Sequence, residues 1–288
     1  MYFERRHRVM VWSLSSAVGG LVLLLPLLTG LYTPEAPYII PLSQKANNIM
    51  ALGLVIALLP PALLEYTNHR WEREVDRNIP RLLRDITESV SSGVTLPRAL
   101  EEASRRSYGP LSREMEHALA EFILGASWEE ALTSLADRLN RPSARRLCTI
   151  LIEAHQVGGR MMEVLNSGVE LFSSLEEYRE EKYTQMRPYT LTVYIAALIF
   201  LVIANVVLHQ FLIPLSERQE VLLLGAPLLP HILDIAYYRS ILFWASTMEA
   251  LFGGLVAGKI GDGSIRAGLR HSVTLLSITV LLFNALAT

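Results

Sequence analysis

The strongest constraint on the fold is the way charge is distributed along the chain. Of the 26 Lys and Arg residues and the 28 Asp and Glu residues, 17 and 20 fall between residues 67 and 187. Long apolar runs flank this segment on both sides, and the whole chain has a mean hydropathy of +0.31. Such segregation predicts a polar module joined to membrane-embedded parts. The net charge of −2 gives no reason to expect a nucleic-acid partner.

Five apolar runs are candidates for membrane spans. They cover residues 9–32, 46–66, 189–215, 235–257 and 275–286, the last with its flanks. A helix needs about 20 apolar residues to cross a bilayer, and the fifth run reaches that length only with its flanking residues. Residues 216–234 are expected outside, because the apolar stretch 221–229 is too short to cross.

The basic residues predict the orientation of these spans, since Lys and Arg favour the cytoplasmic side. Basic residues precede the first run, follow the second and lie between the fourth and fifth (Arg5, Arg6, Arg8; His69, Arg70, Arg73, Arg77; Lys259, Arg266, Arg270). We therefore expect a multi-pass protein of the cell membrane with a cytoplasmic N-terminus. Its parts are two N-terminal spans (1–66), a cytoplasmic bundle (67–187) and three C-terminal spans (188–288).

Helical periodicity and turn signals divide the charged segment into six helices. They are expected at 71–92, 96–107, 111–124, 128–139, 143–157 and 160–187. Strand signals are absent. The first helix is expected to bend at Pro80, and the sixth to continue or kink into the third span at Pro188. The predicted fold is all-α: a polytopic membrane protein with about five transmembrane helices and a six-helix cytoplasmic bundle.

A repeated sequence motif occurs at two of the predicted turns. Gly93-Val94-Thr95-Leu96-Pro97-Arg98-Ala99-Leu100 recurs as Gly125-Ala126-Ser127-Trp128-Glu129-Glu130-Ala131-Leu132. In each copy we expect the glycine to close one helix in the left-handed conformation, and Thr95 or Ser127 to cap the next. Glu130 adds a capping box in the second copy, and Pro97 occupies the opening turn in the first.

The sequence contains no evident catalytic or cofactor-binding constellation, so we expect neither enzymatic activity nor a cofactor or metal. The single cysteine, Cys148, lies in an apolar helical pattern and is interpreted as a core residue. The stretch from Gly253 to Ile260 approaches a phosphate-binding loop, but Ile260 offers no hydroxyl and no strand precedes the glycines. Close helix packing explains these glycines better. The histidines are scattered, and no nucleophile elbow is present.

Two polar residues lie well inside predicted spans. Glu249 is near the middle of the fourth and Asn205 near the middle of the third. An intramembrane carboxylate suggests function, so Glu249 is either a coupling residue or a member of an internal ion pair or hydrogen bond. For Asn205 the choice is between a coupling role and helix–helix adhesion.

The motifs together resemble a known family. They are residues 83–93, Leu96-Pro97-Arg98-Ala99-Leu100, Tyr108-Gly109-Pro110-Leu111, residues 127–132, Ile152-Glu153-Ala154, Gly158-Gly159 and Pro188-Tyr189. As a linked series over residues 75–215 they resemble the type II secretion F-protein domain, with the nearest likeness to archaeal pilus and archaellum platform proteins and tight-adherence C proteins. Several of those relatives carry two such domains, whereas this chain shows one.

The resemblance implies a membrane assembly platform. Its expected partners are a hexameric secretion ATPase, pilin or archaellin subunits, the bilayer, and a second copy or a sister platform subunit. As ATPase-binding residues we predict Arg145, Arg146, Gly158, Gly159 and Arg160, and also Lys259, Arg266 and Arg270. Two alternatives remain. A transporter would show repeated membrane segments around a central charged site, and a receptor would need a larger outer domain.

Overall fold

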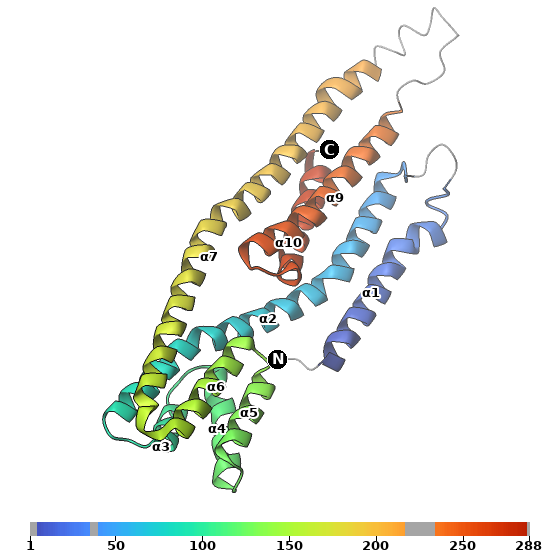
Figure 1. Cartoon of the computed structure of the whole chain (residues 1–288). Coiled ribbons are helices and arrows are strands. Elements are labelled where there is room, and N and C mark those ends of the chain that lie inside the picture. The colour runs from blue at the N-terminus through green and yellow to red at the C-terminus, as the bar shows by residue number, and fades with distance from the viewer. Residues whose placement is uncertain (1–4, 35–39, 217–233, 287–288) are drawn as a thin grey trace, which may run out of the picture. The chain divides into compact units, whose positions relative to one another are not determined.

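The structure is a computed structural model that describes residues 5–34, 40–216 and 234–286. Within these ranges every regular element is a helix, and five helices are long and apolar enough to cross a membrane (Figure 1). These observations confirm the predicted all-α polytopic fold. Most of the segment expected outside, residues 217–233, falls outside the described residues.

Short turns join the helices from α2 to α7. In chain order they are α1 (Arg5–Leu28), α2 (Gln44–Ser91), α3 (Leu96–Ser104), α4 (Pro110–Ile123), α5 (Trp128–Leu139), α6 (Pro142–Val157), the 3₁₀ turn η1 (Gly158–Arg160), α7 (Met161–Val206), the π-helical turn η2 (Val207–Leu212), α9 (Ile235–Gly261) and α10 (Ile265–Leu286). The chain divides into two compact units, which we call the bundle unit (Thr67–Thr184) and the membrane unit (Arg5–Tyr66 with Gln185–Thr288).

The long helix α2 differs from the prediction. Separate helices were expected at 46–66 and 71–92, but α2 is a single helix of 48 residues that runs through both units. The separation was wrong because residues 67–70, Thr-Asn-His-Arg, contain neither glycine nor proline and so do not interrupt helical hydrogen bonding.

Two consecutive prolines lie inside α2 and would each leave one carbonyl without its helical partner. Pro60 and Pro61 lack the N–H groups that would bond to the carbonyls of Ile56 and Ala57. Ser15 of α1 replaces them, because its hydroxyl lies 3.1 Å from the Ile56 oxygen and 2.7 Å from the Ala57 oxygen. This neighbour allows the helix to pass through the prolines in an apolar setting.

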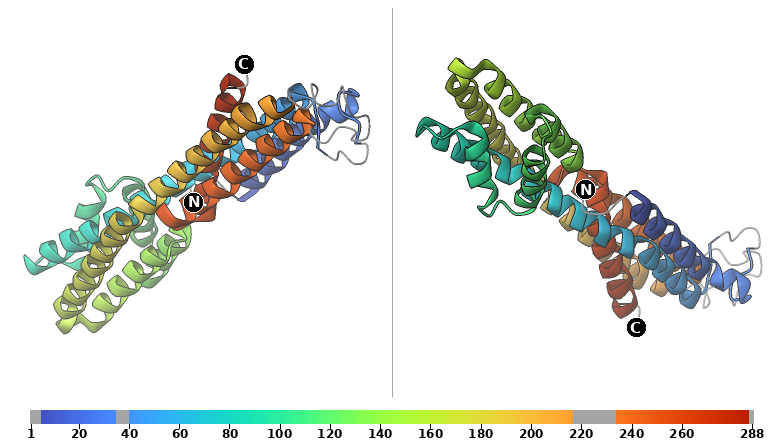
Figure 2. Two further views of the ribbon diagram at one scale, coloured as in Figure 1. Left: turned by 90° about the horizontal axis from the view of Figure 1, so that it is seen from above. Right: turned by 90° about the horizontal axis from the view of Figure 1, so that it is seen from below.

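The bundle unit is built around a continuous apolar core. The helices α3 to α6 pack with the parts of α2 and α7 that belong to this unit (Figure 2). Buried side chains come from all six helices, among them Leu82, Leu100, Met115, Leu135, Leu147 and Phe172. Cys148 is buried among them, as predicted. Ion pairs tie the helices at the surface of the core, with Arg141 at 2.9 Å from Glu72 and 2.6 Å from Asp76.

The two copies of the repeat end their preceding helices in the same way. Gly93 and Gly125 have φ of +91° and +105°, which confirms the predicted left-handed conformation. Each glycine N–H bonds back to Val90 or Phe122, and the next residue's N–H to Ser89 or Glu121. This pair of bonds is the Schellman motif.

The caps that follow the glycines differ between the copies. At Ser127 the predicted capping box is present, with Glu130 N–H donating to Ser127 Oγ at 3.2 Å and Ser127 N–H donating to Glu130 Oε2 at 2.9 Å. Thr95 occupies the cap position but makes no side-chain capping bond, so that prediction was wrong. The reason is that Pro97 removes one of the two N–H groups such a cap can use.

The long helix α7 continues from the bundle unit into the membrane unit. It passes Pro188 without interruption and then changes to the π-helical geometry of η2. The expected continuity of the sixth predicted helix with the third span is therefore confirmed.

Helices α9 and α10 form a tightly packed hairpin in the membrane unit. A basic loop was expected between the last two spans, but Lys259 lies in α9, Arg266 and Arg270 lie in α10, and only Asp262–Ser264 is non-helical. The loop prediction was wrong because Gly263, with φ of +72°, turns the chain at once. A Cβ on Gly258 would lie 2.1 Å from Gly268 Cα, and one on Gly254 would lie 2.2 Å from Ser272 N. The predicted packing role of these glycines is confirmed.

Candidate functional site

The first group of predicted partner-binding residues lies on α6 and η1 in the bundle unit. Arg145 and Arg146 are exposed. Among the residues that the structure describes, the Arg145 guanidinium approaches Asn140 Oδ1 at 3.5 Å and the exposed Asp137 at 3.9 Å, and such weak exposed contacts leave it free to exchange partners. Gly158, with φ of +57°, lets α6 end and the chain turn into α7. Gly159 and Arg160 are exposed within the turn.

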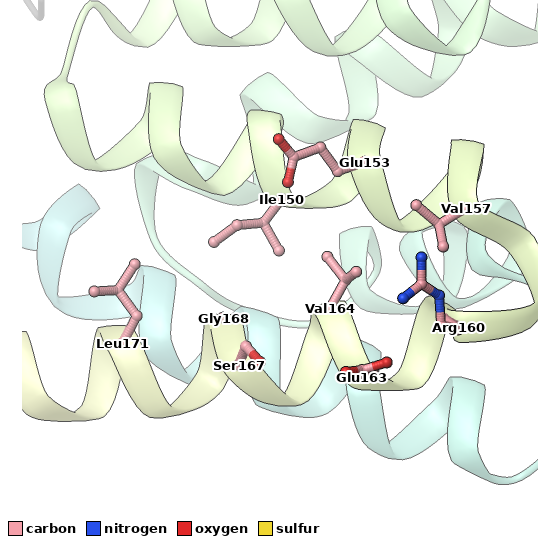
Figure 3. A pocket seen from close by; sticks show the side chains of 9 residues that line it. All are labelled: Ile150, Glu153, Val157, Arg160, Glu163, Val164, Ser167, Gly168 and Leu171. Carbon is pink, nitrogen blue, oxygen red and sulfur yellow. The ribbon is translucent and has the colours of Figure 1, made fainter.

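A groove lies between α6 and α7 next to this turn. It has a volume of about 380 Å³ and is lined by Ile150, Glu153, Val157, Arg160, Glu163, Val164, Ser167, Gly168 and Leu171. Figure 3 shows Arg160 with Val157 and Glu163 at one end, and Ile150 and Leu171 at the other. The groove therefore offers an apolar floor with charged groups around one end. This arrangement suits an amphipathic protein segment better than a small polar molecule.

The two predicted arginines of α6 differ in their relation to this groove. At 3.6 residues per turn, Arg146 lies on the same face of α6 as Glu153, which lines the groove. Arg145 is turned toward α5, where it approaches Asp137.

The second predicted group, Lys259, Arg266 and Arg270, belongs to the membrane unit. Lys259 Nζ lies 3.4 Å from the Gly263 carbonyl, and Arg266 is exposed. Arg270 is different, because its guanidinium pairs with Asp262 Oδ2 at 2.7 Å and lies 5.3 Å from the centroid of the Tyr66 ring. The positive charge of Arg270 is therefore already paired within the chain. The binding role of all three residues stays a prediction.

A polar network at the α9–α10 turn was missed by sequence reasoning. The Asp262 side chain is only 4% exposed and accepts from Arg270, with His271 Nε2 at 3.5 Å. His271 Nδ1 lies 2.6 Å from the hydroxyl of Tyr194 on α7. The network thus joins the hairpin to α7 and, through the Tyr66 ring, to α2. In the sequence Asp262 reads only as part of a turn, and nothing local marks its partners.

The two intramembrane candidates have no interhelical partner among the described residues. Glu249 is partly buried in α9 and makes neither an ion pair nor a hydrogen bond there, so the internal pairing that was its alternative role is not seen in that part of the chain. Asn205 donates to the Leu201 carbonyl of its own helix at 3.1 Å, while its Oδ1 has no partner in the described structure. Their coupling roles stay predictions.

The titratable groups with shifted pKa values in the bundle unit are structural. Burial and the neighbouring Asp85 raise the pKa of Tyr108 to about 12, since its hydroxyl donates to that carboxylate. Burial likewise raises the pKa of Cys148 to about 12. Among the described residues no group of three or more His, Cys, Asp or Glu side chains could hold a metal ion.

Comparison with known proteins assigns the central part of the chain. The family described as type II secretion system (T2SS), protein F, matches residues 82–209. An uncharacterized protein of Methanocaldococcus jannaschii is 24% identical over 238 residues, which are 83% of this chain and 38% of that relative. The chain thus spans well under half the length of the curated relative. No solved structure matches. The resemblance found over residues 75–215 is confirmed: residues 82–209 match the type II secretion system protein F family, in a chain whose described residues include five helices long and apolar enough to cross a membrane.

Proposed function

We propose that the chain is the membrane assembly platform of a type IV pilus-like or archaellum machine. In this role it couples a cytoplasmic secretion ATPase to the insertion of filament subunits. The observation that carries the proposal is the family domain, which covers most of the bundle unit and extends along α7 into the membrane unit. This sequence shows no recognisable nucleotide-binding motif, so the proposal assigns the energy source to a separate ATPase, for which a charged helical surface is a suitable contact.

Two continuous helices support a mechanical role. Both α2 and α7 run through the boundary between the units without a break, at residues 66–67 and 184–185. Because a helix is stiff along its axis, a displacement of the bundle unit would be carried along α2 and α7 rather than absorbed by a flexible linker. The network at Asp262 would pass part of that displacement to α9 and α10.

The proposed contact for the ATPase is the side of the bundle unit with Arg145, Arg146, Arg160 and the neighbouring groove. These arginines are exposed, and none is held in a short ion pair among the described residues. They can therefore pair with carboxylates of a partner without first losing a strong internal partner.

The test is binding of the full-length protein, in detergent or nanodiscs, to its secretion ATPase. Reversal of Arg145, Arg146 and Arg160 to Glu should weaken binding at least tenfold while helicity and thermal stability stay unchanged. Arg113→Glu with Glu116→Arg on α4 is the control, because both side chains are exposed and lie outside this surface. Binding that is unchanged by the triple reversal would remove this surface from the proposal.

The proposed step inside the membrane can be tested separately from ATPase binding. Glu249 is a carboxylate with no internal partner among the described residues, so a filament subunit or a proton could engage it. Glu249→Gln should reduce filament assembly and leave ATPase binding intact. Normal assembly by this variant would exclude Glu249 as the coupling residue.

A further inference from the structure

Polar side chains join three helices of the membrane unit to one another. Asn47 of α2 is completely buried, donates to Ser240 Oγ of α9 at 2.9 Å and accepts from Trp244 Nε1 at 2.9 Å. Asn48 of α2 and Asn284 of α10 exchange two hydrogen bonds, at 2.7 and 3.1 Å. Because unpaired amides are costly in an apolar setting, these bonds hold α2, α9 and α10 in one arrangement.

The first helix, α1, is braced against α2 in the same unit. Arg8 pairs with Glu65 at 2.6 Å, and the Ser15 hydroxyl bonds to two carbonyls of α2. A Cβ on Gly19 would lie 2.4 Å from Ala57 Cβ, so the two helices touch at the backbone. We call α1, α9, α10 and the membrane-unit part of α2 the frame.

The part of α7 and η2 that follows Pro188, residues 189–216, contacts the frame through different chemistry. We call this part the α7 span. Leu201 and Leu208 pack with apolar frame residues that include Phe243, and Val193 Cγ1 lies 3.5 Å from where a Cβ on Gly253 would be. Apolar contacts are non-directional, and a glycine has no side chain to interlock with the facing helix. These contacts therefore allow the α7 span to slide.

Three polar atoms of the α7 span are buried without a partner. Thr190 Oγ1, Asn205 Oδ1 and His209 Nε2 have no hydrogen bond to any residue that the structure describes, and Asn205 is only 6% exposed. The other two such atoms in the described membrane unit, Gln44 Oε1 and Arg239 Nε, lie in the first two turns of α2 and α9. Since an unpartnered buried polar atom costs free energy, another position of the α7 span could recover what this one loses.

The two ends of the α7 span are held differently. Near its start Tyr194 Oη lies 2.6 Å from His271 Nδ1 of α10, and near its end is the π-helical turn at Val207–Leu212. Pro214 explains this turn, because it has no N–H and its ring crowds the Gln210 carbonyl four residues earlier. Turns of this type frequently occur at functional sites, and here the turn lets helix geometry change beyond the Tyr194 contact.

We propose that the α7 span is a displaceable helix on a fixed frame. It alternates between the described position and one in which its buried polar groups find partners, as a two-state element does. Shifts of packed helices measure about 1–5 Å. The use of this movement in filament assembly rests on the function proposed above: force on the bundle unit reaches α2 and α7, and because α2 is tied to the frame, α7 moves relative to it.

Distances between spin labels test the movement in the full-length protein in nanodiscs, without ATPase or filament subunits. Ile195→Cys with Val256→Cys reports on α7 and α9, and Leu52→Cys with Phe252→Cys is the control within the frame, since all four side chains are exposed. Cys148 is buried and stays unlabelled.

The α7 pair should give two distances that differ by about 2–5 Å, and the frame pair a single distance. Asn205→Leu removes an unpartnered atom from the described position, so it should shift the α7 pair towards one distance and leave the frame pair unchanged. A single distance for the α7 pair without this substitution, or an equal spread for both pairs, would overturn the proposal.

A reversible disulfide tests whether assembly uses the movement. A Cβ on Gly261 would lie 3.7 Å from Thr190 Cβ, a separation suited to a disulfide, so oxidation of Thr190→Cys with Gly261→Cys should lock α7 to α9. Assembly should stop on oxidation and return on reduction, whereas oxidised Asn47→Cys with Ser240→Cys, which joins two frame helices, should still assemble filaments. Assembly with α7 locked would overturn this use of the movement. If the unsubstituted chain supports no assembly, the platform role fails, and the label distances alone decide whether α7 moves.

Discussion

Ser15→Ala tests how the membrane unit tolerates two prolines inside a spanning helix. The Ser15 hydroxyl is the group that contacts the carbonyls of Ile56 and Ala57, at 3.1 and 2.7 Å. This hydroxyl has one proton to donate, which the two carbonyl oxygens share. Hydrogen bonds inside membrane proteins average about 0.6 kcal/mol and reach about 1.7. Because a carbonyl without a partner in an apolar setting costs more than that average, we expect a loss of about 1–2 kcal/mol.

The assay is thermal unfolding of the full-length protein in one detergent. A loss of that size corresponds to a fall in Tm of about 2–8 °C. Ser13→Ala is the matched control, since Ser13 is exposed and its hydroxyl donates to the Met10 carbonyl of its own helix at 3.0 Å. The Tm of this control should stay within about 1 °C of the wild type.

A double-mutant cycle makes the test specific to the prolines. With Pro60→Ala and Pro61→Ala the restored N–H groups bond to the same two carbonyls, so Ser15→Ala should then cost little. A coupling energy of about 1 kcal/mol is expected. If Ser15→Ala costs the same in both backgrounds, or no more than Ser13→Ala, the assigned role of this serine is refuted.

Three further outcomes are expected in the same unfolding assays. Gly254→Ala should lower the free energy of unfolding by about 1–3 kcal/mol, because the added Cβ would lie 2.2 Å from Ser272 N. Gly253→Ala is the control and should be nearly neutral, since the nearest atom to its added Cβ is 3.5 Å away. Equal effects of the two substitutions would contradict the close packing of α9 and α10. Ser127→Ala should cost about 1 kcal/mol through loss of the capping box and Thr95→Ala clearly less, because Thr95 makes no capping bond. The pKa of Tyr108 is raised to about 12 in the folded protein, above the usual value of about 10, so folding favours the neutral phenol. The stabilisation that comes from keeping Tyr108 neutral is fully present below pH 10 and should be lost between about pH 10 and 12. Tyr108→Phe should remove that part of the alkaline loss, and an equally steep loss in the variant would contradict the assignment.

Local signals were enough to predict most helix boundaries. The helix α5 begins and ends where predicted, at Trp128 and Leu139, because a capping box precedes it and Asn140 adopts the left-handed conformation after it. The identical reasoning failed at Thr95, where Pro97 changes which N–H groups are available. A local pattern is therefore reliable only where every donor it assumes is present.

Contacts between distant segments could not be predicted from the pattern. Ser15 reads as an ordinary small residue of the first span until α2 is placed beside it, and Asp262 reads as a turn residue until Arg270, His271 and Tyr194 surround it.

The most direct test of the platform role is the side of the membrane on which the bundle unit lies. Thr133, an exposed residue of α5, is replaced by cysteine in the full-length protein. Cys148 does not interfere, because it is buried and its thiol has a pKa of about 12. A membrane-impermeant maleimide should label Thr133→Cys only after the cells are permeabilised, and should label Thr33→Cys in intact cells. Labelling of Thr133→Cys in intact cells would place the bundle unit outside, beyond the reach of a cytoplasmic ATPase, and would contradict the proposed function.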